Sequence, residues 1–199
     1  MNSDSRIPRG PATSPAPAGS AKAELRRQLS AARTALPGPT RAGWDQALGA
    51  HLLAWCGAGG WPQVAVYWAL AGEPDLTPAY AALAARGVAL LLPVVVEKHA
   101  ALAFAHWLPG EAMVKDKMGV AVPAHLRLAP CPPALLVPCL GFSPARLRLG
   151  YGGGYYDRTL ALAPRPATAG IAYACQRAAF AADPHDIALD VILTEAGPL

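Results

Sequence analysis

Four glycines, two arginines and one aspartate lie within a single stretch, RLGYGGGYYDR, residues 148 to 158. This much glycine is costly inside a helix or strand and favours a loop. The amides of such a loop can turn toward one point, because no Cβ restricts φ, and they can then bind a phosphate. Arg148 and Arg158 add positive charge, whereas Asp157 requires a cation such as Mg²⁺ between itself and a phosphate. The stretch therefore predicts a site for a metal-bound nucleotide.

A second interpretation of the same stretch is purely structural. The string matches neither GxxxxGK[ST] nor GxGxxG, and glycine content alone is a weak indication of function. A tight turn with Asp157 beside a helix N-terminus has the same spacing. On spacing alone, both interpretations stay open.

The elements around the loop indicate where it lies in a fold. Near-continuous apolar runs, typical of strands buried on both faces of a parallel sheet, occur at 63–70, 88–96, 134–142, 167–174 and 188–195, with a further candidate at 101–108. Helices are predicted over 21–36, 40–56 and 77–87 and from about residue 154. The alternation predicts an α/β fold whose ligands bind at the carboxyl ends of strands. The glycine stretch follows the 134–142 strand and so occupies that position.

The composition favours one globular domain. Of the 199 residues, 53% are hydrophobic and 15% are charged, which is enough apolar material for a core. Residues 1–20 are rich in Pro, Ala, Ser and Gly, so we expect a disordered tail there and a single domain over 21–199. The net charge is +4 without any run of five basic residues, which favours a small anionic ligand over nucleic acid.

The cysteines and the apolar runs exclude some classes of protein. The four cysteines form no CxxC or zinc-like pattern, so we expect reduced and mostly buried thiols in a cytoplasmic protein. The longest apolar run, VALLLPVVV, is too short to cross a membrane. We expect small-molecule ligands, no nucleic acid or membrane partner, and a monomer.

Several blocks together carry a resemblance to a known family. RLGYGGGYYDR closely resembles the signature of the 5-formyltetrahydrofolate cyclo-ligases, also called 5,10-methenyltetrahydrofolate synthetases. Three further blocks resemble that family in the same order, namely KAELR, VAVYWALAGEPDLTP and GIAYACQ…DPHDIALDVILTE. The resemblance runs from about Lys22 to Glu195. It implies a three-layer Rossmann-like sandwich with a mostly parallel sheet, similar to sugar-phosphate isomerases and CoA transferases.

The resemblance also implies an activity. The expected reaction is the ATP- and Mg²⁺-dependent cyclisation of 5-formyltetrahydrofolate to 5,10-methenyltetrahydrofolate, with release of ADP and phosphate. A formamide oxygen is a poor leaving group, and phosphorylation by ATP would make it a good one before N10 attacks. Such an enzyme must hold both substrates together, screen phosphate charge and exclude water.

The resemblance assigns roles residue by residue. Arg148 and Tyr155 are the catalytic positions, and Asp157 and Asp190 are the metal pair. ATP would contact Lys22, Arg26, Arg148, Leu149, Gly150, Tyr151, Gly152, Gly153, Gly154, Tyr155 and Tyr156. The folate would contact Trp68, Glu73, Tyr151, Gly152, Gly153, Gly154 and Tyr155. Without the resemblance, Lys22 and Arg26 would be a solvated helix face, Trp68 and the tyrosine pair would be core, and Asp190 would be a strand-end carboxylate.

Two departures from the family pattern keep alternatives open. Ser143 stands where the family commonly has Asp, and Val122 precedes Pro123 where Glu is common. These changes favour a non-catalytic nucleotide- or folate-binding module as one alternative, and the basic pI prompts an RNA-binding module as another. His185, Asp186, Lys115 and Lys117 are expected to be loop residues.

Overall fold

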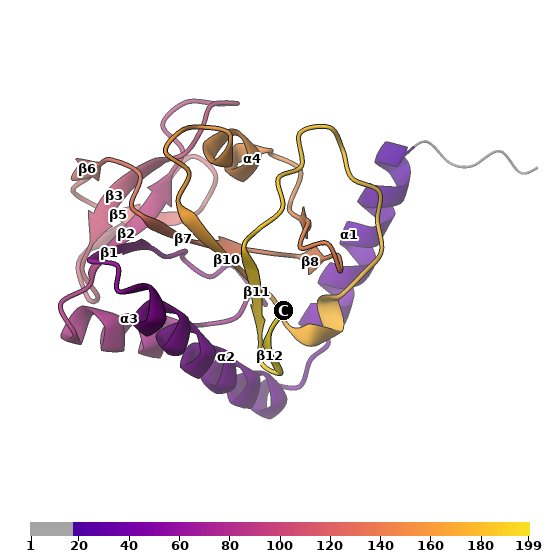
Figure 1. Ribbon diagram of the computed structural model, residues 1–199, viewed down its shortest axis with the longest axis horizontal. Helices are drawn as coiled ribbons and strands as arrows, with labels where there is room; N and C mark the ends of the chain where they lie inside the picture. Colours follow the sequence, from indigo (N-terminus) through magenta and orange to yellow (C-terminus); the bar gives the residue numbers. More distant parts are fainter. Residues whose placement is uncertain (1–17) are drawn as a thin grey trace, which may run out of the picture.

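One eight-stranded sheet organises the chain in the computed structural model, which describes residues 18–199 (Figure 1). Five neighbouring strands are parallel, in the order β11 (Val191–Thr194), β10 (Ala167–Ile171), β7 (Ala134–Pro138), β1 (Gln63–Ala65) and β2 (Ala89–Val94). Antiparallel strands border them, with β12 (Gly197–Pro198) beside β11, and with β3 (Ala103–Trp107) and β6 (Leu128–Ala129) beyond β2. The predicted α/β class with a mostly parallel sheet is confirmed.

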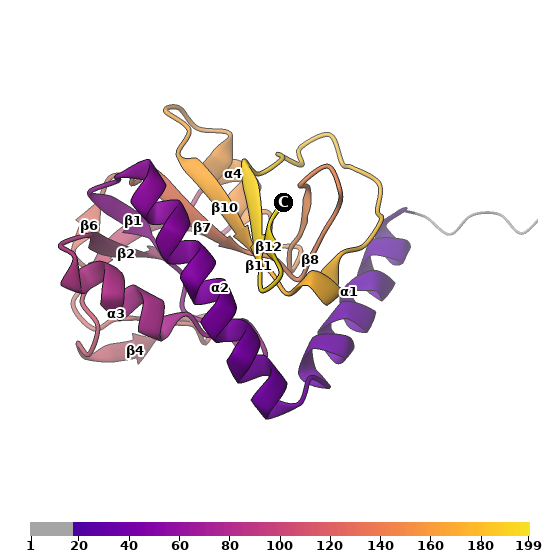
Figure 2. The same cartoon turned by 60° about the horizontal axis from the view of Figure 1, so that its bottom comes forward.

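Helices cover the two faces of the sheet. The long α2 (Gly38–Gly59) and α3 (Thr77–Ala85) pack on one face, and the short α4 (Tyr155–Leu160) packs on the other (Figures 1 and 2). The strands alternate between the two cores: Leu90 and Leu136 face α2 and α3, whereas Leu91 and Leu135 face the α4 side. This alternation within unbroken apolar runs is what a sheet covered on both faces requires.

Helix α1 (Ala18–Thr34) stands apart from α2 and α3, beside the small hairpin of β8 (Gly141–Phe142) and β9 (Arg148–Leu149) (Figure 1). Its Leu29 packs on Leu140 and Leu149 in a small core of its own. The helix begins three residues earlier than the predicted boundary at residue 21, and the rest of the predicted tail, residues 1–17, lies outside the described residues. Packing against the hairpin therefore places α1 next to the glycine stretch that follows β9.

Two elements differ from the sequence-based expectation. The run 63–70 forms a strand only as far as Ala65, after which the chain leaves the sheet as a loop over 66–76. The polar segment around Lys115 and Lys117 is a hairpin of β4 (Met113–Lys115) and β5 (Ala121–Pro123) rather than a plain loop. Asp116 closes its turn by accepting the amides of Met118 and Val120 at 2.8 and 2.9 Å.

The cysteines are all free, but only two of the four, Cys56 and Cys139, are buried, and Cys131 and Cys175 are exposed. Burial raises the pKa of the Cys56 and Cys139 thiols to about 12, so both are inert neutral thiols. Between residues 18 and 199, no helix combines the length and the apolar character that a membrane span needs.

Candidate active site

The glycine stretch follows β9 and leads directly into α4. Gly152 and Gly154 have φ values of +92° and +65°, in the left-handed region that side chains disfavour. These two positions allow the backbone to reverse between the hairpin and the helix. The segment from Gly150 to Gly154 is called the glycine loop below.

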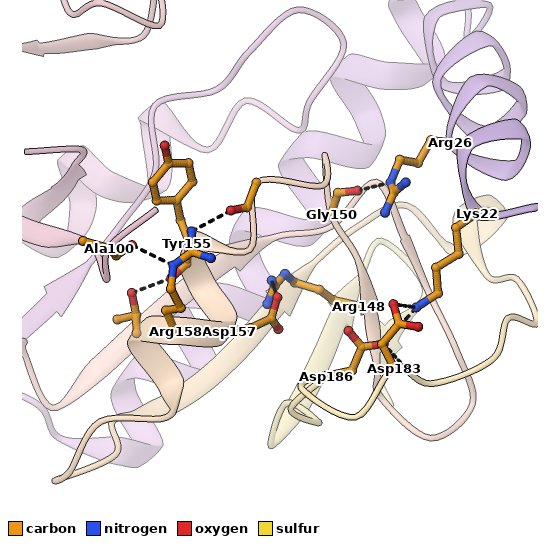
Figure 3. A network of polar contacts seen from close by, with 12 residues as sticks. Lys22, Arg26, Ala100, Arg148, Gly150, Tyr155, Asp157, Arg158, Asp183 and Asp186 are labelled. Atoms are coloured by element: carbon orange, nitrogen blue, oxygen red, sulfur yellow. Dashed lines mark hydrogen bonds and ion pairs between the residues drawn. The ribbon is translucent and has the colours of Figure 1, made fainter. Parts of the chain in front are cut away.

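Two arginines hold the carbonyl groups of the glycine loop. Arg26 Nε donates to the Gly150 carbonyl at 2.8 Å, and Arg158 Nη2 donates to the Gly153 carbonyl at 2.6 Å (Figure 3). In the part of the chain that the structure describes, no amide from Gly150 to Gly154 donates a hydrogen bond to another protein group. The loop thus carries free donors while two of its carbonyls are held by arginines, an arrangement that suits an anion site.

Arg148 and Asp157 form an ion pair beside the loop. Arg148 Nη2 lies 2.7 Å from Asp157 Oδ2, and the Arg148 side chain is only 6% exposed (Figure 3). The guanidinium also lies over the ring of Tyr156, 5.3 Å from its centroid. Arg148 Nη1 is buried without a hydrogen-bond partner within residues 18–199. An unpaired buried donor of a cation is costly, and an anion in the cavity would satisfy it.

Lys22 links α1 to the segment before β11. Its Nζ lies 2.6 Å from Asp183 Oδ2 and 3.1 Å from Asp186 Oδ2 (Figure 3). Desolvation lowers the pKa of Lys22, but the hydrogen bonds and charges of the two aspartates outweigh it, so the pKa is raised above 10.5. Lys22 is therefore charged at neutral pH and is 9% exposed.

A single cavity of about 600 Å³ joins these groups. It opens at the carboxyl ends of β1 and β7, where loops leave the sheet. Every predicted site residue except Asp190 lines it, namely Lys22, Arg26, Trp68, Glu73, Arg148, Leu149, Gly150, Tyr151, Gly152, Gly153, Gly154, Tyr155, Tyr156 and Asp157. The structure therefore brings together residues from α1, from the loop after β1 and from the glycine loop.

Apolar and aromatic side chains line the cavity together with the charged groups. Trp68 is 40% exposed and is not a core residue. Its ring packs edge to face on the ring of Trp107, with 6.0 Å between the two ring centroids. Met118 and Val120, from the β4–β5 turn, add apolar surface. Glu73, 5% exposed, supplies a carboxylate in this apolar surrounding. Such a surface suits a flat heterocycle with N–H donors at one edge.

The predicted metal pair is not assembled, which corrects the assignment of Asp190. Its Oδ2 accepts the amide and the hydroxyl of Thr168, both at 2.7 Å, and its Oδ1 lies 3.2 Å from Arg165 Nη2. Asp190 immediately precedes β11 and lies level with the start of β10, so it is at the amino end of these parallel strands. The cavity lies at the carboxyl ends of these strands. Asp190 instead connects the starts of β10 and β11 through its hydrogen bonds with Thr168.

Sequence reasoning assigned only loop roles to some residues that line the cavity. Asp183, His185 and Asp186 contribute to its wall, and the DPHD string was their only sequence signal. On the β4–β5 hairpin, Asp116, Met118 and Val120 line the cavity. A polar segment with no clear periodicity gave no indication of which of its side chains would turn inward.

The two departures from the family pattern have structural explanations. Ser143 is buried and closes the β8–β9 turn, with its Oγ accepting the Leu147 amide at 3.2 Å. Val122 is buried against Val94 and Ala105 in a small apolar cluster. Neither residue lines the cavity. The departures therefore leave the groups of the site unchanged.

Comparisons with known proteins match the sequence and the fold to one family. The model of the 5-formyltetrahydrofolate cyclo-ligase family matches residues 18–195. Two curated relatives are named 5-formyltetrahydrofolate cyclo-ligase, from Mycoplasma pneumoniae (46% identical over 61 residues) and Mycoplasma genitalium (47% identical over 58 residues). The matched segments cover 30% and 29% of this chain and only 37% and 35% of those relatives.

Solved structures match over much longer ranges. A 5,10-methenyltetrahydrofolate synthetase from Mycoplasma pneumoniae superposes with a TM-score of 0.69 at 26% identity, covering 87% of this chain and 98% of that one. The NMR structure of the Aquifex aeolicus 5,10-methenyltetrahydrofolate synthetase gives a TM-score of 0.77 at 26% identity, covering 89% and 91%.

The ion pairs of Lys22 generate a prediction for stability against pH. A raised pKa in the folded state means that the contribution is complete below 10.5 and is lost as the pH rises through the folded value. Lys22→Met should lower the free energy of unfolding by about 1–3 kcal/mol at neutral pH. Urea titrations should show this difference shrinking above pH 10.5. Lys98→Met, at an exposed position, is the control and should change little; a Lys22 difference that persists undiminished would contradict the assignment.

The position of Asp190 generates a second prediction. Asp190→Ala removes the acceptors of Thr168 and should lower the free energy of unfolding by about 1–3 kcal/mol. Its affinity for MgATP, measured by calorimetry, should stay within about twofold of the unmodified protein, because Asp190 does not line the cavity. Thr168→Val is a matched control with a similar loss of stability. A strong loss of MgATP affinity in folded Asp190→Ala would restore the metal role.

Proposed function

The chain belongs to the 5-formyltetrahydrofolate cyclo-ligase family, and from this membership we propose that it converts 5-formyltetrahydrofolate and ATP to 5,10-methenyltetrahydrofolate, ADP and phosphate. The observation that carries the proposal is the cavity itself. Free loop amides, three basic side chains, Trp68 and Glu73 all line it. Two dissimilar ligands would thus meet in one enclosure.

ATP would bind beside the basic side chains and the free amides of the glycine loop. Lys22, Arg26 and Arg148 reach the cavity from two elements and surround the glycine loop. In the proposed complex, the loop amides and the free Nη1 of Arg148 donate to phosphate oxygens. Tyr155 and Tyr156 border the same loop, and Tyr155 is the proposed catalytic neighbour of Arg148.

The folate would bind beside Trp68 and Glu73. The pterin ring of a tetrahydrofolate presents N–H donors at one edge, which the Glu73 carboxylate would accept. The glycine loop and the adjoining Tyr155 would contact both ligands, because all of these residues line the cavity. This placement would hold the formyl group next to the terminal phosphate.

The chemistry has two steps in this proposal. In the first, the formyl oxygen attacks the γ-phosphorus, the bond to the β–γ bridging oxygen breaks, and ADP leaves. In the second, N10 attacks the formyl carbon, the carbon–oxygen bond breaks, phosphate leaves, and the N10 proton is released. Arg148 and the loop amides would stabilise the charge on the transferring group. Exclusion of water protects the phosphorylated intermediate from hydrolysis.

Mg²⁺ would be held by Asp157 together with phosphate oxygens and water. Asp157 lines the cavity, and Arg148 occupies its Oδ2. Among residues 18–199 there is no group of three His, Cys, Asp or Glu side chains that could cage a metal. This fits Mg²⁺, which commonly binds one or two carboxylates and completes its shell with substrate phosphates and water. The ion would screen the phosphate charge from Asp157.

The non-catalytic binding module is the second candidate, and its support came from Ser143 and Val122. Since both side chains lie outside the cavity, they give no reason to expect lost catalysis. The RNA-binding alternative needs basic residues on an open surface, but Lys22 and Arg148 are buried in ion pairs around the cavity. The observed contacts therefore favour the enzyme.

Turnover is tested directly by mixing the full chain with 5-formyltetrahydrofolate and MgATP. The absorbance of the methenyl product should appear, with one ADP released for each product molecule. ATP binding without the chromophore, in protein that is shown to be folded, would support the binding module instead. Loss of nucleic-acid affinity with rising salt, without any effect of ATP, would support RNA binding.

Asp157→Asn should weaken turnover at limiting Mg²⁺ while the fold survives. The amide keeps an acceptor for Arg148 but loses the negative charge that attracts the ion. We expect kcat/KM for MgATP to fall by about tenfold or more, with partial recovery at high Mg²⁺. Glu97→Gln, at an exposed position, is the matched control. Unchanged dependence on Mg²⁺ in folded Asp157→Asn would refute the metal assignment.

A further inference from the structure

Three polar side chains from three separate segments are linked across the folate side of the cavity. Arg33, on α1, donates from Nη2 to the Tyr151 hydroxyl at 2.8 Å. The Tyr151 hydroxyl in turn donates to Glu73 Oε1 at 2.6 Å. Tyr151 belongs to the glycine loop, and Glu73 belongs to the loop after β1. A chain of two short hydrogen bonds therefore joins α1 to both loops.

The two ends of this chain are buried charges. Arg33 is 2% exposed and Glu73 is 5% exposed. No direct ion pair joins them within the described residues, so the Tyr151 hydroxyl is the group that connects cation and carboxylate. Burial and the charge of Glu73 raise the pKa of Tyr151 to about 12, against the opposing effect of Arg33. The hydroxyl thus keeps its proton and has a fixed direction, accepting from Arg33 and donating to Glu73.

Arg33 is poorly satisfied for a buried cation. Its Nε and Nη1 have no hydrogen-bond partner in residues 18–199. The guanidinium packs instead against the chain at Gly72, whose φ is +80°, and a Cβ there would lie 3.5 Å from Arg33 Nε. Burying a charge with so few partners is costly, and an apolar side chain of similar size would often be more stable. Stability alone does not account for arginine at this position.

The arrangement orients the carboxylate of Glu73. Its Oε2 accepts the Leu70 amide at 2.9 Å, and its Oε1 accepts Tyr151, so both oxygens are oriented by protein donors. Each carboxylate oxygen retains a further lone pair for a ligand donor. The side chain also lines the cavity, so these remaining acceptor sites are available to a ligand.

From these contacts we propose that Arg33 is a positioning residue for the folate site. Through the Tyr151 hydroxyl it fixes the Glu73 carboxylate and the glycine loop relative to each other before any ligand binds. This rests on the proposed function, because the positioned carboxylate is the one that would take the pterin edge. Arg33 contacts neither substrate; it acts through Tyr151.

Replacing Arg33 should change the KM for one substrate and leave the KM for the other nearly unchanged. Arg33→Met should raise the KM for 5-formyltetrahydrofolate by about tenfold, because a misplaced Glu73 loses a charge-assisted hydrogen bond. The KM for ATP should stay within about twofold, since Lys22, Arg26 and Arg148 are untouched. Tyr151→Phe should give a similar rise in folate KM, and the double variant should add nothing further, because both changes break the same chain. Effects that multiply, an unchanged folate KM or an equal rise in both KM values would overturn the proposal.

The matched control is Arg27→Met on the same helix. Within the described residues Arg27 forms one ion pair, with Glu24, and it is 78% exposed, so its loss should leave both KM values unchanged. If Arg33→Met fails to fold, Arg33→Lys takes its place. Lysine keeps the charge but lacks the planar guanidinium, so the KM for 5-formyltetrahydrofolate should still rise at least about threefold. Combining Arg33→Lys with Tyr151→Phe should cause no further rise in this KM. An unchanged KM for 5-formyltetrahydrofolate in Arg33→Lys, or a further rise of this KM in the double variant, would also overturn the proposal.

A ligand-free measurement separates this inference from the proposed function. Hydrogen exchange in the apo protein should accelerate in peptides covering 148–156 and 68–75 when Arg33 is replaced, and should not change in Arg27→Met. If the unmodified protein gives no methenyl product but this exchange pattern appears, the function fails and the positioning role stands. If exchange in both loops is unchanged, the positioning role fails even where turnover is present.

Discussion

The site depends on one constraint: arginines hold two carbonyls of the glycine loop while the loop amides are free in the described part of the chain. Arg26 and Arg158 each take one carbonyl, at 2.8 and 2.6 Å, and no amide from Gly150 to Gly154 is used by another group in the described residues. Because a peptide unit is planar, fixing its carbonyl also fixes the direction of the N–H on its far side. The two arginines therefore do more than add charge, since they orient the backbone that would bind the phosphates.

Helix α1 connects this constraint to the rest of the molecule. Its successive turns present Lys22 to Asp183 and Asp186, Arg26 to the glycine loop, and Arg33 to Tyr151. Apolar contact is modest, with Leu29 packed on Leu140 and Leu149. The docking of α1 is thus largely polar, and two of the basic side chains that hold it in place, Lys22 and Arg26, also line the cavity. In the proposed complex, a helix bound in this way would link the nucleotide side to the folate side without an element of the sheet between them.

The parallel sheet decides which acidic residues share the site. Glu73 lies in the loop after β1 and Asp157 lies in the first turn of α4, and both line one cavity at the carboxyl ends of the strands. Asp190 precedes β11 and is held by Thr168 and Arg165 at the other end. Asp190 belongs to a sequence block that resembles the family, yet it lies away from the cavity. The reason is that residues before and after a strand lie at opposite ends of the sheet. The same geometry accounts for Ser143 and Val122, which close a turn and fill a small core away from the cavity.

From the sequence alone one could predict the α/β class, the order of the main elements and the glycine loop. These follow from local properties: unbroken apolar runs, helix-breaking Pro and Gly, and glycines that permit left-handed backbone at Gly152 and Gly154. It also named the residues that line the cavity, through a family resemblance. It missed the β4–β5 hairpin, the wall formed by Asp183 and Asp186, and the role of Arg33, and it misplaced Asp190. These features arise from hydrogen bonds between residues far apart in the chain, which depend on how segments dock, and no local pattern encodes that docking.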